Sequence, residues 1–304
     1  MIYTLTLNPS IDYVLSLDEI VPASVNRASS QNFFPGGKGI NVSIVLSRLG
    51  TPSVALGFVS GFTGSQIVDS LASSGSLIRP DFITSETVGQ FSRINVKLET
   101  KSSETEINAP GPDITESDEK KLFEKLGLLR DGDTLVLAGS IPPSLESDFY
   151  SRIMKKLSAR KINFVVDATK KLLTDCLQFR PFLVKPNNHE LGEIFGVTLE
   201  TAQDCIPYAK KLRDMGAQNV LVSLGGNGAV LVSEENVLEC ACPRIKVVNT
   251  VGSGDSMVAA FIHSLGENKS FAESLKFAVA AGSASASRNW LCNKNDVEKM
   301  LEKF

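Results

Sequence analysis

Short apolar runs alternate with longer amphipathic stretches along most of the chain. The apolar runs predict strands at residues 2–7, 53–58, 134–138, 163–167, 182–184 and 220–224. Between them, apolar residues recur at helical spacing in residues 40–49, 64–73, 116–126, 148–159 and 202–215. This alternation favours an α/β fold in which helices cover both faces of a mostly parallel sheet.

Two segments do not follow this alternation. Residues 12–17 alternate polar and apolar positions directly after the first strand, and residues 91–98 and 104–108 predict a hairpin across a polar turn. Together they predict a small antiparallel sheet over one edge of a single domain spanning residues 1–304, built from insertions at about 10–35 and 88–109. The last third adds a meander at residues 229–232 and 237–241, then three helices from about residue 253 to the end.

Composition narrows the possible partners. The formal net charge is −3 and the isoelectric point is about 5.6, so a general nucleic-acid or anionic-membrane surface is not expected, although a local basic pocket remains possible. The five cysteines form no C-x-x-C pair, which favours reduced thiols. No stretch reaches the roughly 18 apolar residues that a membrane span needs, and no cleavage signal follows the first strand, so we expect a cytoplasmic protein.

A glycine-rich turn with one acidic residue, TVGSGD at residues 250–255, stands before a helical pattern. The start of a helix leaves backbone N–H groups unpaired, and these donors with the helix dipole attract phosphate. The carboxylate of Asp255 could accept a hydroxyl proton there while the backbone of Gly252, Ser253 and Gly254 holds a transferring phosphoryl group. The simpler alternative is that Asp255 is only a favourable first-turn acid.

A second glycine-rich segment, PGGKGIN at residues 35–41, also precedes a helix. Its glycines let the backbone approach a ligand closely, and Lys38 supplies a cation. It is not a Walker A loop, because glycine follows Lys38 where that loop has serine or threonine. A plain glycine turn that caps a helix would explain the same residues.

Two further segments follow predicted strands. The turn SLGGNG, residues 223–228, could let the backbone pass a nucleotide phosphate, but it lacks dinucleotide-binding spacing and also suits a β-turn in the meander. In KPNNHE, residues 185–190, Asn187 and Glu190 share a helical face and carry oxygen ligands that suit Mg²⁺, usually through water. A helix cap with its acidic partner is the alternative. We expect His189 to be a packing residue.

Arg93, Asn95 and Lys97 project to one face of their predicted strand, because side chains alternate along a strand. Two cations and an amide on one face would form a clamp for a sugar phosphate. A solvated strand face is the competing interpretation.

Taken in order, these motifs resemble those of the ribokinase-like carbohydrate kinases of the PfkB family. The resemblance covers essentially the whole chain and rests on NPSID (8–12), GGKGIN (36–41), KPN with Glu190, and GSGD (252–255). Within the family the chain is most similar to 1-phosphofructokinases, through TLNP (6–9), Asn26-Arg27, RINVK (93–97), TEIN (105–108) and AGSIP (138–142). Tagatose-6-phosphate kinases share much of this pattern.

The resemblance implies a three-layer α/β/α domain with a small β-sheet lid, dimers formed through the lid, ATP and Mg²⁺ as cofactors, and Asp255 as catalytic base. It implies a substrate site at Asp12, Gly36, Gly37, Lys38, Asn41, Arg93, Arg27 and Gly139, where Asp12 and Asn41 hold sugar hydroxyls and Lys38, Arg93 and Arg27 lie near the existing phosphate. It implies a nucleotide site at Lys185, Asn187, Ser223, Leu224, Gly225, Gly226, Asn227, Gly228 and Gly254, with Asn187 and Glu190 on the metal side, through water. Catalysis would use Gly252, Ser253, Gly254 and Asp255.

The chain departs from the family pattern at a few positions. Ser253 stands where alanine is usual, which adds a hydroxyl to the anion site. The segment DATKK, residues 167–171, lacks the Ser-Gly that commonly follows its aspartate, and no role is assigned to it. Ser60 replaces a frequent glycine.

The function that follows is phosphorylation of fructose 1-phosphate at O6 by MgATP, giving fructose 1,6-bisphosphate and ADP. The alternatives within the family are a tagatose-6-phosphate kinase, a 6-phosphofructokinase, or a kinase of unphosphorylated sugars or nucleosides. From a different class, a non-catalytic sugar-phosphate sensor would keep the fold but would not need Asp255 as a base.

Overall fold

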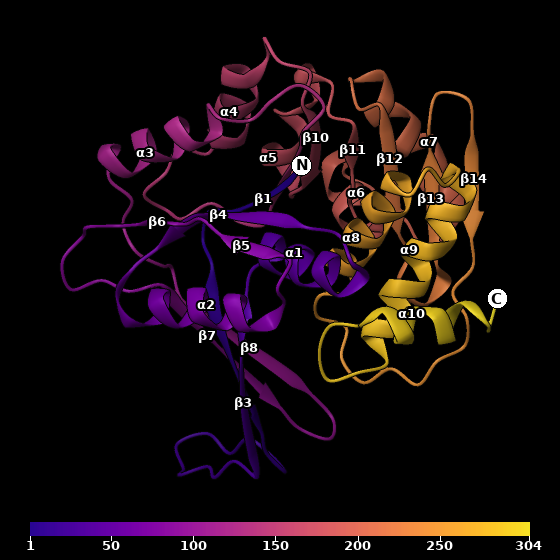
Figure 1. Ribbon diagram of the computed structural model, residues 1–304. Helices are drawn as coiled ribbons and strands as arrows, with labels where there is room; N and C mark the ends of the chain where they lie inside the picture. The colour runs from indigo at the N-terminus through magenta and orange to yellow at the C-terminus, as the bar shows by residue number, and fades with distance from the viewer.

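A ten-stranded sheet forms the centre of the computed structural model, which describes residues 1–304 (Figure 1). In pairing order its strands are β14 (Val237–Cys240), β13 (Ala229–Val232), β12 (Asn219–Ser223), β11 (Leu183–Val184), β10 (Asn163–Asp167), β9 (Thr134–Ala138), β1 (Ile2–Thr6), β4 (Ser53–Val59) and β5 (Ile78–Pro80), with β6 (Ile83–Thr84) beside β4. Neighbours from β12 to β5 pair in parallel, and β13 and β14 are antiparallel. The predicted mostly parallel sheet is therefore confirmed.

Helices cover both faces of this sheet, as predicted. One layer contains α1 (Lys38–Leu49), α2 (Gly61–Ser74), α8 (Ser253–Gly266), α9 (Phe271–Ala286) and α10 (Lys294–Leu301); the other contains α3 (Glu116–Leu126), α4 (Phe149–Leu157), α5 (Lys170–Thr174), α6 (Asn188–Phe195) and α7 (Ala202–Asp214). Short 3₁₀ turns lie at Leu177–Phe179 (η1) and Gly225–Asn227 (η2). Successive strand residues join different cores: Leu135 and Leu137 pack on one face, Val136 on the other.

No helix of the structure combines the length and the apolar character that a membrane crossing requires.

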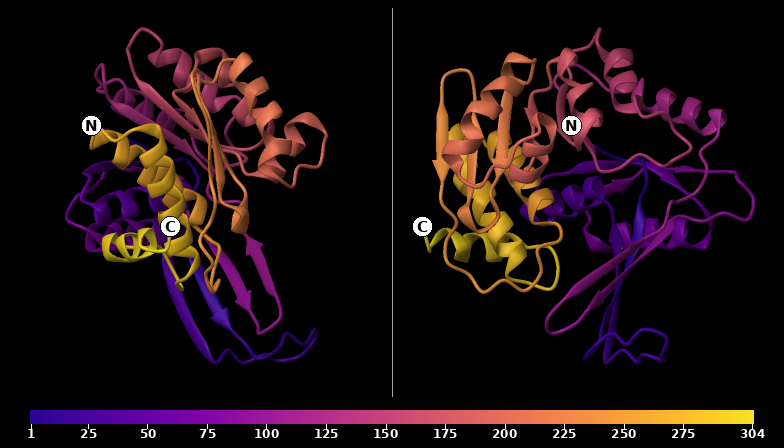
Figure 2. Two further views of the ribbon diagram at one scale, coloured as in Figure 1. Left: turned by 90° about the vertical axis from the view of Figure 1, so that its right-hand side faces the viewer. Right: turned by 180° about the vertical axis from the view of Figure 1, so that it is seen from behind.

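A second sheet of four strands extends away from this body, and we call it the lid (Figure 2). Its order is β3 (Ser30–Gly36), β2 (Ser10–Ser16), β7 (Arg93–Glu99) and β8 (Glu104–Asn108). The predicted antiparallel arrangement is wrong at its centre, because β2 and β7 pair in parallel. Each of these two strands leaves the body first, and β3 and β8 return antiparallel to them.

The sequence pattern did not reveal β3 as a strand. The four residues from Ser30 to Phe33 are exposed, because β3 is an edge strand with little core to contact. An edge strand without a buried face has no period-two hydrophobic signal, and the Pro35-Gly36 end of β3 further disguises it.

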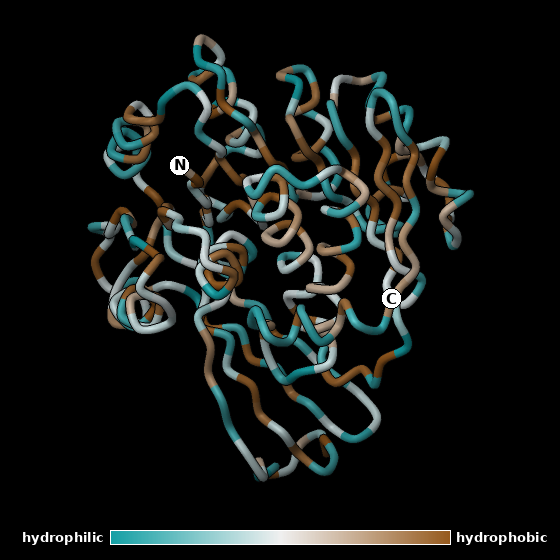
Figure 3. Tube along the Cα trace, turned by 45° about the vertical axis from the view of Figure 1, so that its right-hand side comes forward, coloured by the Kyte–Doolittle hydropathy of each residue, from teal (hydrophilic) through white to brown (hydrophobic).

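The lid is polar on its inner face and apolar on its outer face, and its strands carry both colours in the hydropathy view (Figure 3). Asn95 and Lys97 point inward and are buried, while the alternating residues Ile94 and Val96 are only half-buried. Ile107 on β8 is exposed to 59%. The usual rule for a soluble sheet is thus inverted, because polar groups are enclosed on the side that faces the body.

The chain order creates a crevice at one edge of the main sheet. From β1 the chain passes through the lid and α1 to β4 on one side, whereas from β9 it passes through α4 to β10 on the other. The carboxyl ends of β1 and β9 lie side by side where the direction of winding reverses. Open α/β sheets bind ligands at such a point. Asn8 lies there two residues after the end of β1, and Gly139 directly follows β9.

Candidate active site

Two cavities meet above this crevice. One, of about 830 Å³, is lined by residues of the lid, α1 and the carboxyl ends of β1, β9 and β10, and we call it the lid-side cavity. The other, of about 890 Å³, lies between the Gly225–Asn227 turn, residues 242–247 and α9, and we call it the turn-side cavity. Asn187, Ser223 and Gly254 line both. Each cavity has the size of a small-molecule site, so two ligands can meet at the shared residues.

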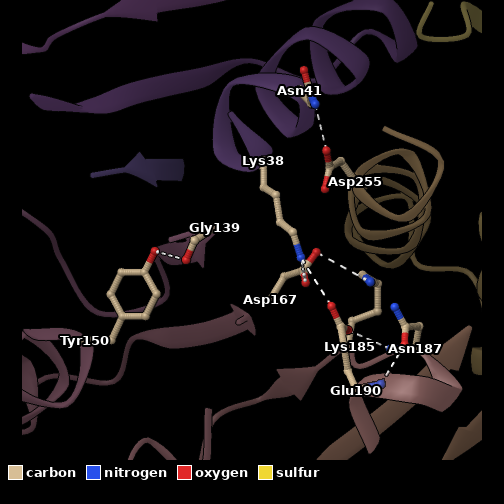
Figure 4. A network of polar contacts seen from close by, with 9 residues as sticks. All are labelled: Lys38, Asn41, Gly139, Tyr150, Asp167, Lys185, Asn187, Glu190 and Asp255. Atoms are coloured by element: carbon tan, nitrogen blue, oxygen red, sulfur yellow. Dashed lines mark hydrogen bonds and ion pairs between the residues drawn. The ribbon is translucent and has the colours of Figure 1, made fainter. Parts of the chain in front are cut away.

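Asp255 lies at this junction. It is in the first turn of α8 and 6% exposed, and its Oδ2 accepts a 2.7 Å hydrogen bond from Asn41 Nδ2 in the first turn of α1 (Figure 4). Burial, and then the negative charge of Asp167, raise the pKa of Asp255 to about 6. A carboxylate with a pKa near the operating pH is well suited to accept a proton.

The backbone around Asp255 supplies free donors. Helix α8 starts after Gly252, which has φ 76° and turns the chain into the helix. The amide of Ser253 donates to Thr250 O at 3.2 Å, whereas the amides of Gly254 and Asp255 lie in the first turn, where a helix offers no acceptor. They can hold a negatively charged group at the junction of the cavities.

A buried carboxylate with two ammonium partners, which the sequence did not single out, lies beside Asp255. Asp167 ends β10, is fully buried, and pairs with Lys38 Nζ at 2.8 Å and Lys185 Nζ at 3.5 Å (Figure 4). Burial alone would raise the pKa of Asp167, but the charges of Lys185 and Lys38 lower it below its usual value. The available signal was its position at the carboxyl end of a strand next to the crevice.

Acidic residues of the body hold Lys38. Its ammonium group lies among Asp167, Asp255 and Glu190, whose charges raise the pKa of Lys38 despite the opposing effect of burial. Lys38 and Lys185 line the lid-side cavity together with the lid cations Arg93 and Lys97, and the expected place of Lys38 near the existing phosphate stays a prediction. The helix α1 begins at Lys38, two residues before the predicted start, which brings Lys38 and Asn41 into one helical turn.

Asn187 and Glu190 form a capping box at the start of α6. Asn187 Oδ1 accepts from Glu190 N at 2.7 Å, and Asn187 N donates to Glu190 Oε2 at 2.8 Å. The cap that was the alternative interpretation is thus present. No group of three or more His, Cys, Asp or Glu residues is arranged to hold a metal ion, but Glu190 Oε1 lies free of the cap, 3.9 Å from Lys38 Nζ. One carboxylate of this kind fits a Mg²⁺ ion held mainly by phosphate oxygens and water.

The glycines of GGKGIN are needed for close packing. A methyl group on Gly36 would lie 2.5 Å from Ser10 Oγ and Asp12 Oδ1, and one on Gly39 would lie 2.6 Å from Thr6 Oγ1. Only glycine lets α1 approach β1 and the lid so closely. The segment thus places Lys38 and Asn41 in the crevice, where Gly37 also lines the lid-side cavity.

The inner face of the lid forms the far wall of the lid-side cavity. Ser10, Asp12, Arg93, Asn95, Lys97, Glu106 and Asn108 all line it. Asp12 Oδ1 accepts from Ser10 Oγ at 2.7 Å and Asn95 Nδ2 at 3.1 Å, and Lys97 Nζ lies between Glu106 Oε1 at 3.1 Å and Asp12 Oδ2 at 3.7 Å. Arg93 donates from Nε to the carbonyl of Asn8 at 3.1 Å. The predicted one-sided face of β7 therefore borders a cavity.

Other predicted residues are distributed between the cavities. Gly36 does not line either one, Gly37, Asn41 and Gly139 line the lid-side cavity, and Leu224 to Gly228 line the turn-side cavity. Arg27 lies in the exposed connection between β2 and β3 and lines neither cavity. Glu106, Asn108 and Asn8 were not predicted as site residues, because each becomes a wall residue only through the pairing of the lid strands and their packing on the body.

Comparison with known proteins identifies relatives over the full length. Residues 5–296 match the pfkB family of carbohydrate kinases. The chain is 43% identical to the 1-phosphofructokinase of Borreliella burgdorferi, with 99% of this chain and 96% of that protein covered. It is 35% identical to the D-tagatose-1-phosphate kinase of Bacillus licheniformis, with 99% and 96% covered. The crystal structure of phosphofructokinase-2 from Escherichia coli with substrates and products superposes with a TM-score of 0.92 at 32% identity, with 99% and 98% covered.

Proposed function

The chain belongs to the pfkB family of carbohydrate kinases, and from that premise we propose that it transfers the γ-phosphoryl group of ATP to O6 of fructose 1-phosphate. The products are fructose 1,6-bisphosphate and ADP. The observation that carries the proposal is the buried Asp255, which lies where two ligand-sized cavities meet and is held by Asn41. A sensor of sugar phosphates would have no use for a carboxylate whose pKa is raised toward neutrality.

The sugar phosphate occupies the lid-side cavity. Its existing phosphate binds the cations of the lid face, Arg93 and Lys97, because a charge-assisted hydrogen bond to phosphate is about twice as strong as a neutral one. Asp12 and Asn41 hold sugar hydroxyls. This orientation leaves the far hydroxyl, O6, at Asp255, so that the length of the sugar sets which oxygen reacts.

ATP occupies the turn-side cavity with its triphosphate directed to the shared residues Ser223, Asn187 and Gly254. Asp255 takes the proton of O6 as that oxygen attacks the γ-phosphorus in line. The amides of Gly254 and Asp255, with Lys38 and Lys185, stabilise charge on the transferring group. Asp167 holds both lysines in place through its ion pairs with them.

A divalent cation accompanies ATP in this family, and Glu190, which lines the lid-side cavity close to the shared residue Asn187, offers an oxygen for Mg²⁺. When bound there, Mg²⁺ neutralises part of the phosphate charge. Asn187 holds the first turn of α6, and so the position of Glu190, through the capping box.

We propose a cytoplasmic homodimer formed through the lid. The half-buried Ile94 and Val96 and the exposed Ile107 and Phe33 lie on the outer lid face. Exposed apolar surface of this kind is typical of an interface. Light scattering of the Ile107→Lys variant should show a monomer at concentrations where the unaltered chain is a dimer; an unchanged mass would exclude this face.

The substrate is tested by ADP release from the purified chain with MgATP and one sugar phosphate at a time. The set is fructose 1-phosphate, tagatose 1-phosphate, tagatose 6-phosphate and fructose 6-phosphate. We expect kcat/KM for fructose 1-phosphate to exceed the others by at least ~100-fold, which corresponds to about 2.7 kcal/mol of transition-state discrimination. Preference for a 6-phosphate would leave the assignment as a sugar-phosphate kinase intact, but the sugar would bind in the cavity in the opposite orientation.

Tagatose 1-phosphate is the nearest competitor, since a relative that is 35% identical carries that activity in its name. Fructose and tagatose 1-phosphates differ only in the configuration of one hydroxyl, so Asp12, Asn41 and Asn95 would decide between them. Comparable kcat/KM values for the two would mean that these side chains do not read that hydroxyl.

A further inference from the structure

A carboxylate already holds one of the two cations on the inner lid face. Glu106 on β8 lies directly opposite Lys97 on β7, and its Oε1 is 3.1 Å from Lys97 Nζ. Asp12 Oδ2 lies 3.7 Å from the same ammonium group. All three residues line the lid-side cavity, where the proposed function places the existing phosphate of the sugar. Lys97 can therefore bind that phosphate only in competition with two carboxylates.

The charges on this face of the lid cancel. The lid residues that line the cavity include two cations, Arg93 and Lys97, and two anions, Asp12 and Glu106. A phosphate group is itself an anion, and bringing like charges together is unfavourable. A phosphate that entered this face without any rearrangement would meet no net positive charge. Its binding at Lys97 requires one of the two carboxylates to move away.

Glu106 is the carboxylate that is free to move. Asp12 accepts two hydrogen bonds, of 2.7 and 3.1 Å, from neighbouring lid side chains, and its own side chain is 16% exposed. The side chain of Glu106 is 40% exposed and belongs to an edge strand. Apart from Lys97, the polar partner of its carboxylate is Asn108 Nδ2 at 3.4 Å. Glu106 can thus turn toward solvent while Asp12 stays in place for the sugar.

Lys97 needs a partner of this kind when no phosphate is bound. Its side chain is 7% exposed, and a buried ammonium group without a counter-charge is strongly unfavourable. Glu106 supplies this counter-charge in the structure. A phosphate oxygen can replace the carboxylate oxygen, because both are charged acceptors for a lysine.

Resting on the proposed function, we infer that Glu106 is a placeholder for the existing phosphate of the sugar. Its carboxylate holds Lys97 until a phosphate oxygen takes its place. Glu106 is then a residue that determines the affinity for sugar phosphates, because each of them must displace it. A hydroxyl group that binds Asp12 requires no such displacement.

The substitution Glu106→Gln tests this inference, because it removes the charge and keeps the shape of the side chain. The affinity for fructose 1-phosphate, measured by calorimetry without ATP, should rise roughly 10-fold, as for the loss of a like charge close to a bound anion. The affinity for ATP should stay the same. The melting temperature of the variant alone should fall by roughly 2 °C, because Lys97 loses a counter-charge.

The opposite sign of the affinity change would overturn the inference. If Glu106 served to orient Lys97 toward the phosphate, Glu106→Gln would bind fructose 1-phosphate more weakly. An unchanged affinity would mean that the carboxylate does not compete with the phosphate at all.

Glu104→Gln is the matched control. Glu104 lies two residues from Glu106 on β8, toward the tip of the lid, and does not line the cavity. The control removes the same charge from the same strand, and its affinity for fructose 1-phosphate should be unchanged. Equal gains in the two variants would overturn the inference, because the net charge of the lid would then limit binding.

A second background separates displacement from simple repulsion. In Lys97→Gln, Glu106 has no ammonium group to hold, so adding Glu106→Gln should change the affinity by less than about twofold. A gain of full size in this background would mean that Glu106 only repels the phosphate through space, and the inference would be wrong.

The inference and the proposed function can fail separately. If the unaltered chain binds fructose 1-phosphate without phosphorylating it, the proposed function fails, while the calorimetric comparison still tests Glu106. If the unaltered chain turns over fructose 1-phosphate and Glu106→Gln binds it no more tightly, only the inference is wrong. Inorganic phosphate is a second probe of the same contact, and it too should bind more tightly to Glu106→Gln than to the unaltered chain.

Discussion

The two cavities that meet at Asp255 are built in different ways. The lid-side cavity is lined by 30 residues, of which four are hydrophobic, and its wall is a lattice of charged and amide side chains. The turn-side cavity is lined by 23 residues, of which seven are hydrophobic, and its wall includes the backbone of Gly225, Gly226 and Gly228. In the proposed function, side chains therefore recognise the sugar phosphate in the lid-side cavity, whereas backbone and apolar surface accommodate ATP in the turn-side cavity.

The difference also appears in what is left unsatisfied. Three buried oxygens of residues that line the lid-side cavity have no hydrogen-bond partner: Thr6 Oγ1, Asn8 Oδ1 and Asn95 Oδ1. Such unpaired groups are typical of a site that binds a polar ligand. At the turn-side cavity, only the Ser253 hydroxyl is in this condition. A nucleotide can be held by stacking and by backbone donors, which do not depend on side-chain identity.

The largest expected effect concerns the residue between the cavities. Replacing Asp255 by Asn should lower kcat by roughly 10²–10⁴, the range for losing a general base, while ATP and sugar phosphate still bind. The hydrogen bond from Asn41 can persist to the amide oxygen. Burial raises the pKa of this carboxyl, so its ionised form destabilises the folded state at neutral pH. The variant should therefore melt at a temperature no lower than that of the unaltered chain.

Asp204 provides the matched control for Asp255. It too is an acid in the first turn of a helix, but it completes the capping box of α7 away from both cavities. Asp204→Asn should lower stability slightly and leave kcat unchanged. Equal kcat losses in the two variants would mean that Asp255 is only a first-turn acid.

The comparison predicts that a side-chain change on the lid affects only one ligand. Arg93→Gln should raise the KM for the sugar phosphate roughly 10- to 100-fold, as for a charge-assisted hydrogen bond, without changing the KM for ATP. The control is Lys101→Gln at the tip of the lid, whose cation pairs with Asp18 in solvent. If Arg93→Gln weakened ATP instead, the two ligands would be in the opposite cavities.

A substitution in the glycine turn of the turn-side cavity should affect the KM for ATP and leave the KM for the sugar phosphate unchanged. A side chain added at Gly226 would meet no atom within 4 Å, and Gly226 does not need a positive φ, so Gly226→Val should fold normally. It should raise the KM for ATP about tenfold, since each misplaced methylene in a fitted pocket has an effect of this size. Gly266→Val is equally open but lies at the end of α8, and it should change neither KM.

The sequence indicated the residues that line the turn-side cavity more completely than those that line the lid-side cavity. Asp255 and the glycine turns are local motifs whose chemistry follows from a few neighbouring residues. Asp167 was not predicted as a site residue, because its ion pairs join it to Lys38 of α1 and to Lys185 after β11. No single segment of the sequence shows that these three residues meet. The ion pair of Lys38 with Asp167 was not predicted for the same reason.

The fold shows the same limit. Parallel strands such as β9 were placed to the residue, because a continuous apolar run is visible in the sequence. The exposed edge strand β3 was missed, and the orientation of β7 against β2 was wrong, because the pairing of lid strands follows from where each enters the lid. The local hydrophobic pattern determines where strands and helices form. Contacts between distant segments determine which strands pair with one another.

The pH dependence of kcat/KM tests whether Asp255, which lies where the cavities meet, acts as the base. Asp255 must be ionised to accept a proton, and burial together with the charge of Asp167 raises its pKa to about 6. The value of kcat/KM should therefore be constant at high pH, halve near pH 6, and fall about tenfold for each further unit of acidification. Removing the neighbouring charge in Asp167→Asn should move this midpoint to lower pH; a midpoint that stays in place would mean that Asp167 does not act on the base.

The smallest expected effect is a spectroscopic one at the base of the lid. Phe34 on β3 stacks on Trp290 with ring centroids 4.7 Å apart, and the guanidinium of Arg48 on α1 lies 4.8 Å from the same indole. Trp290 is the single tryptophan of the chain, so its emission reports the contact between lid and body. In the proposed function the sugar phosphate contacts the lid and ATP does not, so the sugar phosphate alone should change the emission.

The control for the emission change is Phe34→Leu, which removes the stacked ring and should reduce the response to sugar phosphate while leaving Asp255 and both cavities unaltered. An emission change produced in full by ATP alone would show that the lid responds to the turn-side ligand, and that the two cavities are coupled although they are built independently. A response to sugar phosphate alone would instead mean that lid movement belongs to the side-chain-lined cavity, in keeping with recognition by groups that the lid itself carries.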